Sequence, residues 1–243
     1  MKVLSIGNSF SQDAHRYIHA VSKSYGKEIY TVNLYIGGCC LERHVSNIDS
    51  GVADYDYEVN GENTGRKVSL EEGLKAEEWD IITLQQCSAF SGRVPTYLPY
   101  MPRLAEYVRK VCPKAKIYIH QTWAYEEGCE MVKGTAGFDS AEEMLYAVRN
   151  AYNLMAKLIK ADAIIPCGKG MRYLDKEGAK AYRDTYHASL GVGRYTLALI
   201  WYGFLTGEEL TDNDFNAFDE EVSSMEKLQA LAAAQHALKR QQE

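Results

Sequence analysis

The sequence predicts an α/β protein, a three-layer α/β/α sandwich built around a parallel sheet of five strands. Short runs rich in β-branched and aromatic residues recur along the chain, and segments with helical spacing of apolar residues separate them. Strands that alternate with helices in this way pair in parallel and carry helices on both faces of the sheet. The 243 residues, 46% of them hydrophobic, can bury a sizeable core, and we expect residues 1–243 to form a single domain.

Five runs are predicted as the strands of this sheet: residues 3–6, 28–36, 80–84, 116–120 and 162–166. With helices between the strands, we expect a doubly wound sheet of flavodoxin-like topology. Residues 54–69 (DYDYEVNGENTGRKVS) break the rhythm, because they alternate around Asn60-Gly61. This pattern predicts a β-hairpin inserted between the second and third strands. The hairpin either overhangs the ends of the strands or serves as a packing flap or oligomer contact.

Five helices are predicted, at residues 15–25, 103–111, 141–160, 191–205 and 220–240, and a short one follows Ser69. Ser69 and Ser140 each precede a glutamate by three residues, which is a typical signature of a helix start. The tyrosines and methionines of 141–160 fall at helical spacing, so we assign them to the core. The segment 220–240 is polar and rich in alanine, and it predicts a surface helix.

Charge and hydropathy argue against several classes of partner. The net charge is −6, from 27 basic and 33 acidic residues, and no run of Lys or Arg could follow a phosphate backbone. The longest apolar stretch, residues 196–205, is about half of a membrane span. We therefore expect no nucleic-acid partner and no membrane span. The amino terminus lacks a secretory signal, which predicts a cytoplasmic protein as written, although a processed secreted form would look the same.

No motif for a metal or a cofactor is found in the sequence. The six cysteines include no Cys-x-x-Cys pair, which predicts reduced thiols, mostly in the core. Gly37-Gly38 lacks the spacing of a dinucleotide-binding turn. Asp13 and His15 are two residues apart, and alternate residues on a helix point apart, with no third ligand to accompany them. We therefore expect neither a metal nor a cofactor.

Polar and glycine residues follow the predicted strands at the point where each strand ends. In chain order these segments are Gly7-Asn8-Ser9, Gly37-Gly38, Gln85-Gln86, Gln121-Thr122-Trp123 and Cys167-Gly168. Ligands in open parallel sheets bind beyond the carboxyl ends of the strands. We therefore expect a site at this end of the sheet.

Asp184 precedes His187 by three positions. On a helical turn that spacing brings both side chains to one face, where the carboxylate could hold the imidazole in one tautomer. The other histidines are predicted to be structural: His15, His19, His44, His120 and His236. Of these, His15 lies close enough to Ser9 to reach the same end of the sheet, but it has no acid three residues away.

A serine after the first strand, glycine and amide donors after the next two and a late Asp-x-x-His together resemble the SGNH or GDSL family of serine hydrolases. The resemblance spans most of the chain. The motifs IGNSF, WDIITLQQ and QTWA and the tyrosine-rich hairpin are similar to a bacterial branch of that superfamily. The resemblance implies the SGNH hydrolase fold and a serine esterase that works through an acyl-enzyme.

The resemblance also implies a role for individual residues in the first and last motif blocks. Ser9 matches the nucleophile, with Asn8 where the family more often has aspartate. Asp184 and His187 match the orienting acid and the general base.

The two middle blocks imply the donors of an oxyanion hole, which stabilises the negative charge of the transition state. Gly38 matches the glycine that donates its backbone N–H alongside the N–H of Ser9, although Gly37 leaves the register open by one residue. The third block departs from the family pattern, and the amide of Gln85 or Gln86 would replace the usual asparagine.

Aromatic residues after the strands suggest a sugar substrate. Trp123, Tyr125 and Tyr186 either form an apolar wall that stacks on a sugar ring or belong to the core. With Asn8, Trp123 and Tyr186 as substrate-binding residues, we expect hydrolysis of a short-chain ester, an O-acetyl group on a carbohydrate. Two alternatives remain open: a non-catalytic module that binds a carbohydrate or small molecule, and an acyltransferase.

Overall fold

The computed structural model describes residues 1–239, and within them seven strands form one sheet in the order β4-β3-β2-β1-β5-β6-β7. The strands are β1 (Lys2–Gly7), β2 (Tyr30–Tyr35), β3 (Tyr55–Val59), β4 (Glu62–Val68), β5 (Ile81–Leu84), β6 (Lys116–His120) and β7 (Ala163–Ile165). The run β2-β1-β5-β6-β7 is parallel throughout. The order of this run is that of a flavodoxin-like doubly wound sheet. In the whole sheet β1 is the central strand.

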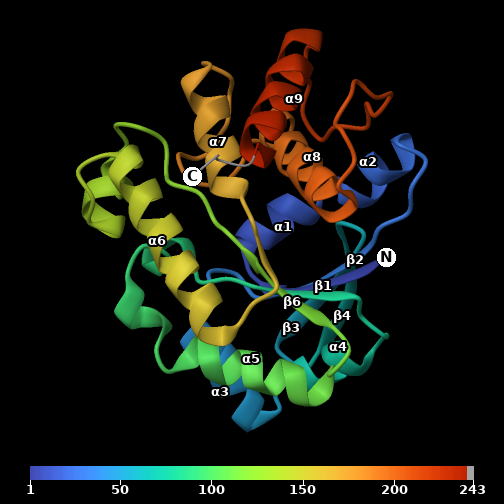
Figure 1. Ribbon diagram of the computed structural model, residues 1–243, viewed down its shortest axis with the longest axis vertical. Helices are drawn as coiled ribbons and strands as arrows, with labels where there is room; N and C mark the ends of the chain where they lie inside the picture. Colours follow the sequence, from blue (N-terminus) through green and yellow to red (C-terminus); the bar gives the residue numbers. More distant parts are fainter. Residues whose placement is uncertain (240–243) are drawn as a thin grey trace.

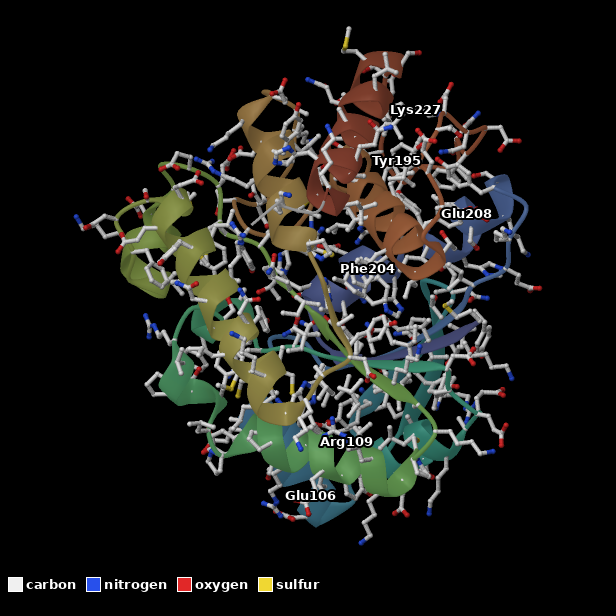
Figure 2. All side chains as sticks on the ribbon, viewed as in Figure 1. Glu106, Arg109, Tyr195, Phe204, Glu208 and Lys227 are labelled. Atoms are coloured by element: carbon white, nitrogen blue, oxygen red, sulfur yellow. The ribbon has the colours of Figure 1, made fainter. Side chains whose placement is uncertain are left out.

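Helices cover both faces of the sheet. They are α1 (Ser9–His15), α2 (Ile18–Ser24), α3 (Leu41–Ser50), α4 (Leu70–Lys75), α5 (Tyr100–Val111), α6 (Ala141–Ile159), α7 (Cys167–Lys176), α8 (Val192–Thr206) and α9 (Ser224–Leu238). Figure 1 shows α1, α2, α7, α8 and α9 on one side of the strands and α3 to α6 on the other. In Figure 2 the labelled Glu106 and Arg109 mark α5 in one layer, while Tyr195 and Phe204 mark α8 in the opposite layer.

The five predicted strands form the parallel run, but the predicted hairpin joins the same sheet, so the sheet is mixed and has seven strands within the described residues instead of five. β3 pairs antiparallel with β2, and β4 pairs antiparallel with β3. Asn60 and Gly61 form the turn with φ values of 52° and 82°, the conformation that tight hairpins require. Tyr55 and Tyr57 are buried, whereas most of β4 is exposed. The hairpin pairs the backbone groups of β2 that would otherwise form a bare sheet edge.

The helices differ from the predicted ones in two ways. The predicted helix at 15–25 is two helices, α1 and α2, and α3 and α7 were not predicted. The sequence of α7 begins with glycines, which disfavour helix. A Cβ at Gly168 would lie 2.6 Å from the Thr122 backbone oxygen, and one at Gly170 would lie 2.4 Å from Ile200 Cδ1. The close packing of α7 therefore requires glycine at both positions. The same glycines explain why the sequence did not predict a helix here.

The alanines of α9 pack against α7 and α8. Ala230, Ala233, Ala234 and Ala237 are buried on the inner face of the helix, while Met225 and Leu228 are exposed. Arg240, where the predicted helix ends, lies outside the described residues. Within residues 1–239 no helix combines the length and the apolar content that a membrane crossing requires.

Candidate active site

The turn between β1 and α1 presents Ser9 at the first position of a helix. Asn8 caps α1, because its side-chain oxygen accepts a hydrogen bond from the Phe10 N–H at 3.0 Å. The Ser11 hydroxyl accepts from the Asn8 N–H at 3.1 Å and completes the capping box. A Cβ at Gly7 would lie 2.1 Å from the Ser11 Oγ. The Gly-Asn-Ser sequence therefore fixes Ser9 directly beyond the central strand.

Asp184 and His187 lie on an irregular loop between α7 and α8, not on the predicted helical turn. A bridge between Tyr182 and Ala188 closes the loop, and Thr185 has a left-handed φ of 73°. Asp184 Oδ1 accepts from the backbone N–H of His187 at 2.8 Å. Asp184 Oδ2 lies 2.7 Å from His187 Nδ1. The carboxylate therefore fixes both the backbone and the ring of the histidine.

The loop brings His187 against the start of α1. His187 Nε2 lies 2.7 Å from the Ser9 Oγ, although the two residues are 178 positions apart. A carboxylate only accepts hydrogen bonds, so the ring N–H faces Asp184 and Nε2 is free to accept from the Ser9 hydroxyl.

Asp184 is suited to remain ionised. Burial by itself raises the pKa of Asp184, but hydrogen bonds from the His187 ring and backbone and the charge of Arg183 outweigh it. The pKa of the carboxyl therefore lies below its usual value. At neutral pH this residue keeps the negative charge that would stabilise a protonated His187.

A cavity of about 260 Å³ opens beside Ser9. Its lining comes from the β1–α1 turn, the end of β2, the segment after β5 and the loop between α7 and α8. The lining residues are Asn8, Ser9, Phe10, Tyr35, Gly37, Gly38, Cys87, Ser88, Tyr186 and His187. Gly38 has a φ of 62°, a conformation that glycine adopts without strain. Three strand ends therefore converge on one cavity together with the histidine loop.

Neither Gln85 nor Gln86 lines this cavity. Gln85 is buried; its amide donates to Asn8 Oδ1 at 2.7 Å, and its Oε1 lies 2.8 Å from His120 Nδ1. Gln86 is also buried, and its amide donates to the Thr96 backbone oxygen at 3.0 Å. These positions do not fit the predicted oxyanion role. Gln85 instead supports the Asn8 cap, and Gln86 binds the loop that contains Thr96. The sequence alone does not distinguish these structural roles from a role in the cavity.

Trp123 is a core residue, so its predicted contact with substrate does not fit its position. Its side chain is fully buried and stacks on Phe10, with the ring centroids 4.3 Å apart. Its Nε1 donates to the Tyr186 backbone oxygen at 2.7 Å. Tyr186 does line the cavity, as does Asn8, whose side chain is occupied by the helix cap. Trp123 therefore supports the cavity from behind.

Four lining residues were not predicted: Phe10, Tyr35, Cys87 and Ser88. Each lies at or just after the end of a strand that contributes to the cavity. Their position after a predicted strand is the sequence feature that could have identified them as lining residues. The Ser88 hydroxyl lies 3.0 Å from the Tyr125 hydroxyl. Of the residues after β5, Cys87 and Ser88 therefore line the cavity, and the preceding glutamines do not.

His15 does not reach the cavity. Its Nε2 lies 2.7 Å from the Ser5 hydroxyl, and its ring packs edge-on against Trp201 at 5.1 Å between centroids. Burial lowers the pKa of His15 to about 3. Burial likewise lowers the pKa of His44 and of His120 to about 3. These three histidines are neutral parts of the core.

The buried neutral state of His15 predicts a pH-dependent stability. His15 becomes protonated below about pH 6.5 in the unfolded chain, but only below about pH 3 in the folded protein, because burial lowers its pKa. Stability is therefore lost as the pH falls, by about 2 kcal/mol at pH 5. His15→Gln lacks this titrating group. Between about pH 7.5 and pH 5, we therefore expect the unfolding free energy of wild type to fall by about 2 kcal/mol more than that of His15→Gln. Urea denaturation measures it, and a constant difference would contradict the assignment.

No metal site is formed by the part of the chain that the structure describes. Within residues 1–239 no three His, Cys, Asp or Glu side chains gather so that they could hold a metal ion. Asp13, considered above with His15, is instead paired with Arg183 and Arg194. The six cysteines are free thiols.

The family model described as "Domain of unknown function (DUF4886)" matches residues 2–237. Among solved structures, a DUF4886 family protein from Bacteroides uniformis is 35% identical to this chain, with a TM-score of 0.89. That alignment covers 98% of this chain and 94% of the other. No curated protein sequence matches the chain.

More distant structures share the fold. A protein from Slackia heliotrinireducens, provisionally described as an SGNH hydrolase, is 23% identical with a TM-score of 0.60, over 84% of this chain and 98% of the other. A variant of Axe2, an acetyl xylan esterase from Geobacillus stearothermophilus, is 16% identical with a TM-score of 0.56, over 87% and 97%. The predicted likeness to the SGNH hydrolase fold is therefore confirmed.

Proposed function

The chain belongs to the DUF4886 family, and from its cavity we propose that it is a serine esterase with Ser9, His187 and Asp184 as nucleophile, general base and orienting acid. The main support for this proposal is the distance of 2.7 Å between His187 Nε2 and Ser9 Oγ. Both residues line an open cavity, where an ester could reach the serine. The shared fold with an SGNH hydrolase and an acetyl xylan esterase supports an esterase-like function.

The proposed reaction begins with attack by Ser9. A neutral hydroxyl is a weak nucleophile, so His187 Nε2 takes the proton as Ser9 Oγ bonds to the ester carbonyl carbon. Asp184 stabilises the resulting imidazolium through its bond to Nδ1. The protonated His187 then donates to the leaving alcohol, and an acyl group remains on Ser9.

Negative charge on the carbonyl oxygen requires donors that are already in place. Ser9 and Gly38 both line the cavity, and among the described residues neither backbone N–H donates to a backbone oxygen. These two N–H groups are the proposed oxyanion hole. Water then attacks the acyl-enzyme, with His187 again as base, and releases the acid and free Ser9.

A short acyl group on a carbohydrate is the proposed substrate. The cavity measures about 260 Å³, which leaves little room for a long acyl chain. Gly37 and Gly38 line it with backbone alone, and Ser88 adds a small side chain. Tyr35 and Tyr186 contribute rings suited to contact a sugar face. The Axe2 neighbour is an acetyl xylan esterase by its description.

The length of the acyl chain tests this substrate class. We expect kcat/KM to be at least about 10-fold higher for p-nitrophenyl acetate than for the octanoate, because extra methylenes have no cavity to fill. Acetylated xylo-oligosaccharides should also release acetate. The Ser9→Ala variant provides the blank for both assays. A preference for the octanoate would contradict the short-chain assignment.

A further inference from the structure

Asp13 connects the helix of Ser9 to the loop of His187. It lies on α1, one helical turn after Ser9, and its side chain is fully buried. Its Oδ1 accepts from Arg183 Nη1 at 2.9 Å, and its Oδ2 accepts from the Ala188 N–H at 3.2 Å. Arg183 directly precedes Asp184, and Ala188 directly follows His187. One carboxylate therefore holds both ends of the segment that carries the acid and the base.

The surroundings of Asp13 are built for a carboxylate. Arg194 of α8 donates from Nε to Asp13 Oδ1 at 2.9 Å, so two guanidinium groups and one backbone N–H all donate to it. A charge buried without such partners would be strongly unfavourable. Arg183 is further tied to the loop, because its Nη1 also donates to the Ala188 backbone oxygen. Asp13 does not line the cavity, and the proposed reaction gives it no proton to transfer.

The loop of His187 contains no helix or strand, and hydrogen bonds hold it at several points. Two bonds reach its middle from outside: the Glu126 N–H donates to the Thr185 backbone oxygen at 2.7 Å, and Trp123 Nε1 donates to the Tyr186 backbone oxygen at 2.7 Å. Within the loop, the Arg183 N–H donates to the His187 backbone oxygen beside the bridge between Tyr182 and Ala188. Asp13 differs from these contacts because it joins the residues that flank Asp184 and His187 directly to the helix of Ser9. We propose that Asp13 is a positioning residue that sets His187 Nε2 against Ser9 Oγ through Arg183 and Ala188. This inference rests on the proposed esterase function. A shift of about 1 Å between reacting groups can lower a rate about 100-fold.

The Asp13→Asn variant tests the proposal, because it keeps the size of the side chain but removes the charge and turns one acceptor into a donor. We expect kcat for p-nitrophenyl acetate to fall about 100-fold, with KM within about two-fold of wild type, since Asp13 does not contact the cavity. Values of kcat are corrected for the folded fraction measured by circular dichroism. A purely structural role would lower the folded fraction and leave the corrected kcat unchanged.

Asp219→Asn is the matched control. Asp219 binds the same Arg194 at 2.8 Å and also Arg16, so its loss weakens a neighbouring ion pair. It makes no contact with residues 183–188 among the hydrogen bonds and ion pairs of the described residues, and we expect its kcat to match wild type. Equal losses of corrected kcat in both variants would overturn the inference.

The remaining outcomes also decide the matter. If Asp13→Asn does not fold, Arg183→Gln replaces it, with a similar expected fall in kcat, and an unchanged kcat in that variant overturns the inference. An active wild type with an unchanged Asp13→Asn variant overturns the inference alone. A wild type without esterase activity overturns the proposed function and this inference with it.

Discussion

Replacement of His187 by alanine is expected to lower kcat for p-nitrophenyl acetate by about 10⁴-fold or more, with little change in KM. His187 Nε2 is the group within hydrogen-bond distance of Ser9 Oγ, at 2.7 Å, that can take the hydroxyl proton as the bond to carbon forms. Without it, attack must proceed from a neutral hydroxyl with water as base. Loss of a nucleophile or its base in a serine hydrolase typically removes most of the catalytic rate.

His236→Ala is the control for this experiment. His236 lies on α9, where its ring stacks on Tyr173 with centroids 4.6 Å apart, and it does not line the cavity. Its variant should keep the wild-type kcat. Steady-state kinetics at saturating ester measures both variants. A His187→Ala variant that retains more than about a tenth of the wild-type kcat would remove His187 from the mechanism.

Replacement of Trp123 by alanine is expected to lower the free energy of unfolding by about 3–5 kcal/mol. The indole is fully buried, stacks on Phe10 at 4.3 Å between centroids and donates to the Tyr186 backbone oxygen at 2.7 Å. Its removal leaves a cavity and takes the indole donor away from the Tyr186 carbonyl. The loss is comparable to a large part of the stability of a typical domain.

Trp123→Phe separates the two contributions of this side chain. It keeps a ring against Phe10 but removes the Nε1 donor, so we expect a smaller loss of about 1–3 kcal/mol. Urea denaturation of the three proteins gives both values. An alanine variant with wild-type stability and a raised KM for acetylated sugars would show instead that Trp123 binds substrate.

The sequence was most informative where regular elements end at a glycine or a polar residue. The run before Gly7-Asn8-Ser9 is β1, the Asn60-Gly61 turn is a hairpin, and Ser140 caps α6. These features depend on local chemistry: a left-handed turn, a capping oxygen, an alternation of buried side chains. Such signals survive in sequence because tertiary contacts are not needed to produce them.

Tertiary contacts decided what the sequence did not reveal. α7 begins with glycines that local propensity assigns to a turn, yet they let the helix approach Thr122 and Ile200 closely. β3 joins the sheet because the edge of β2 needs a partner. Neither requirement can be inferred without knowing which element lies opposite.

The candidate site divides in the same way. The pairing of Ser9 with Asp184 and His187 came from the family resemblance, and the three side chains do meet. Trp123 and the two glutamines after β5 have side chains that could bind a substrate or an oxyanion. In the structure these side chains instead form hydrogen bonds within the protein. The sequence pattern is the same whether a polar or aromatic residue at a strand end faces a cavity or the core. Sequence alone therefore cannot decide which of these residues belong to the site.

The site of covalent labelling tests the activated serine most directly. Wild-type protein treated with a fluorophosphonate should carry one phosphonyl group on Ser9, located by mass spectrometry of its peptides. The His187→Ala variant should label at least about 100-fold more slowly, because the hydroxyl is no longer deprotonated as it attacks. Labelling on Ser88 of the same cavity, or equal rates in the two proteins, would contradict a nucleophile at Ser9 activated by His187.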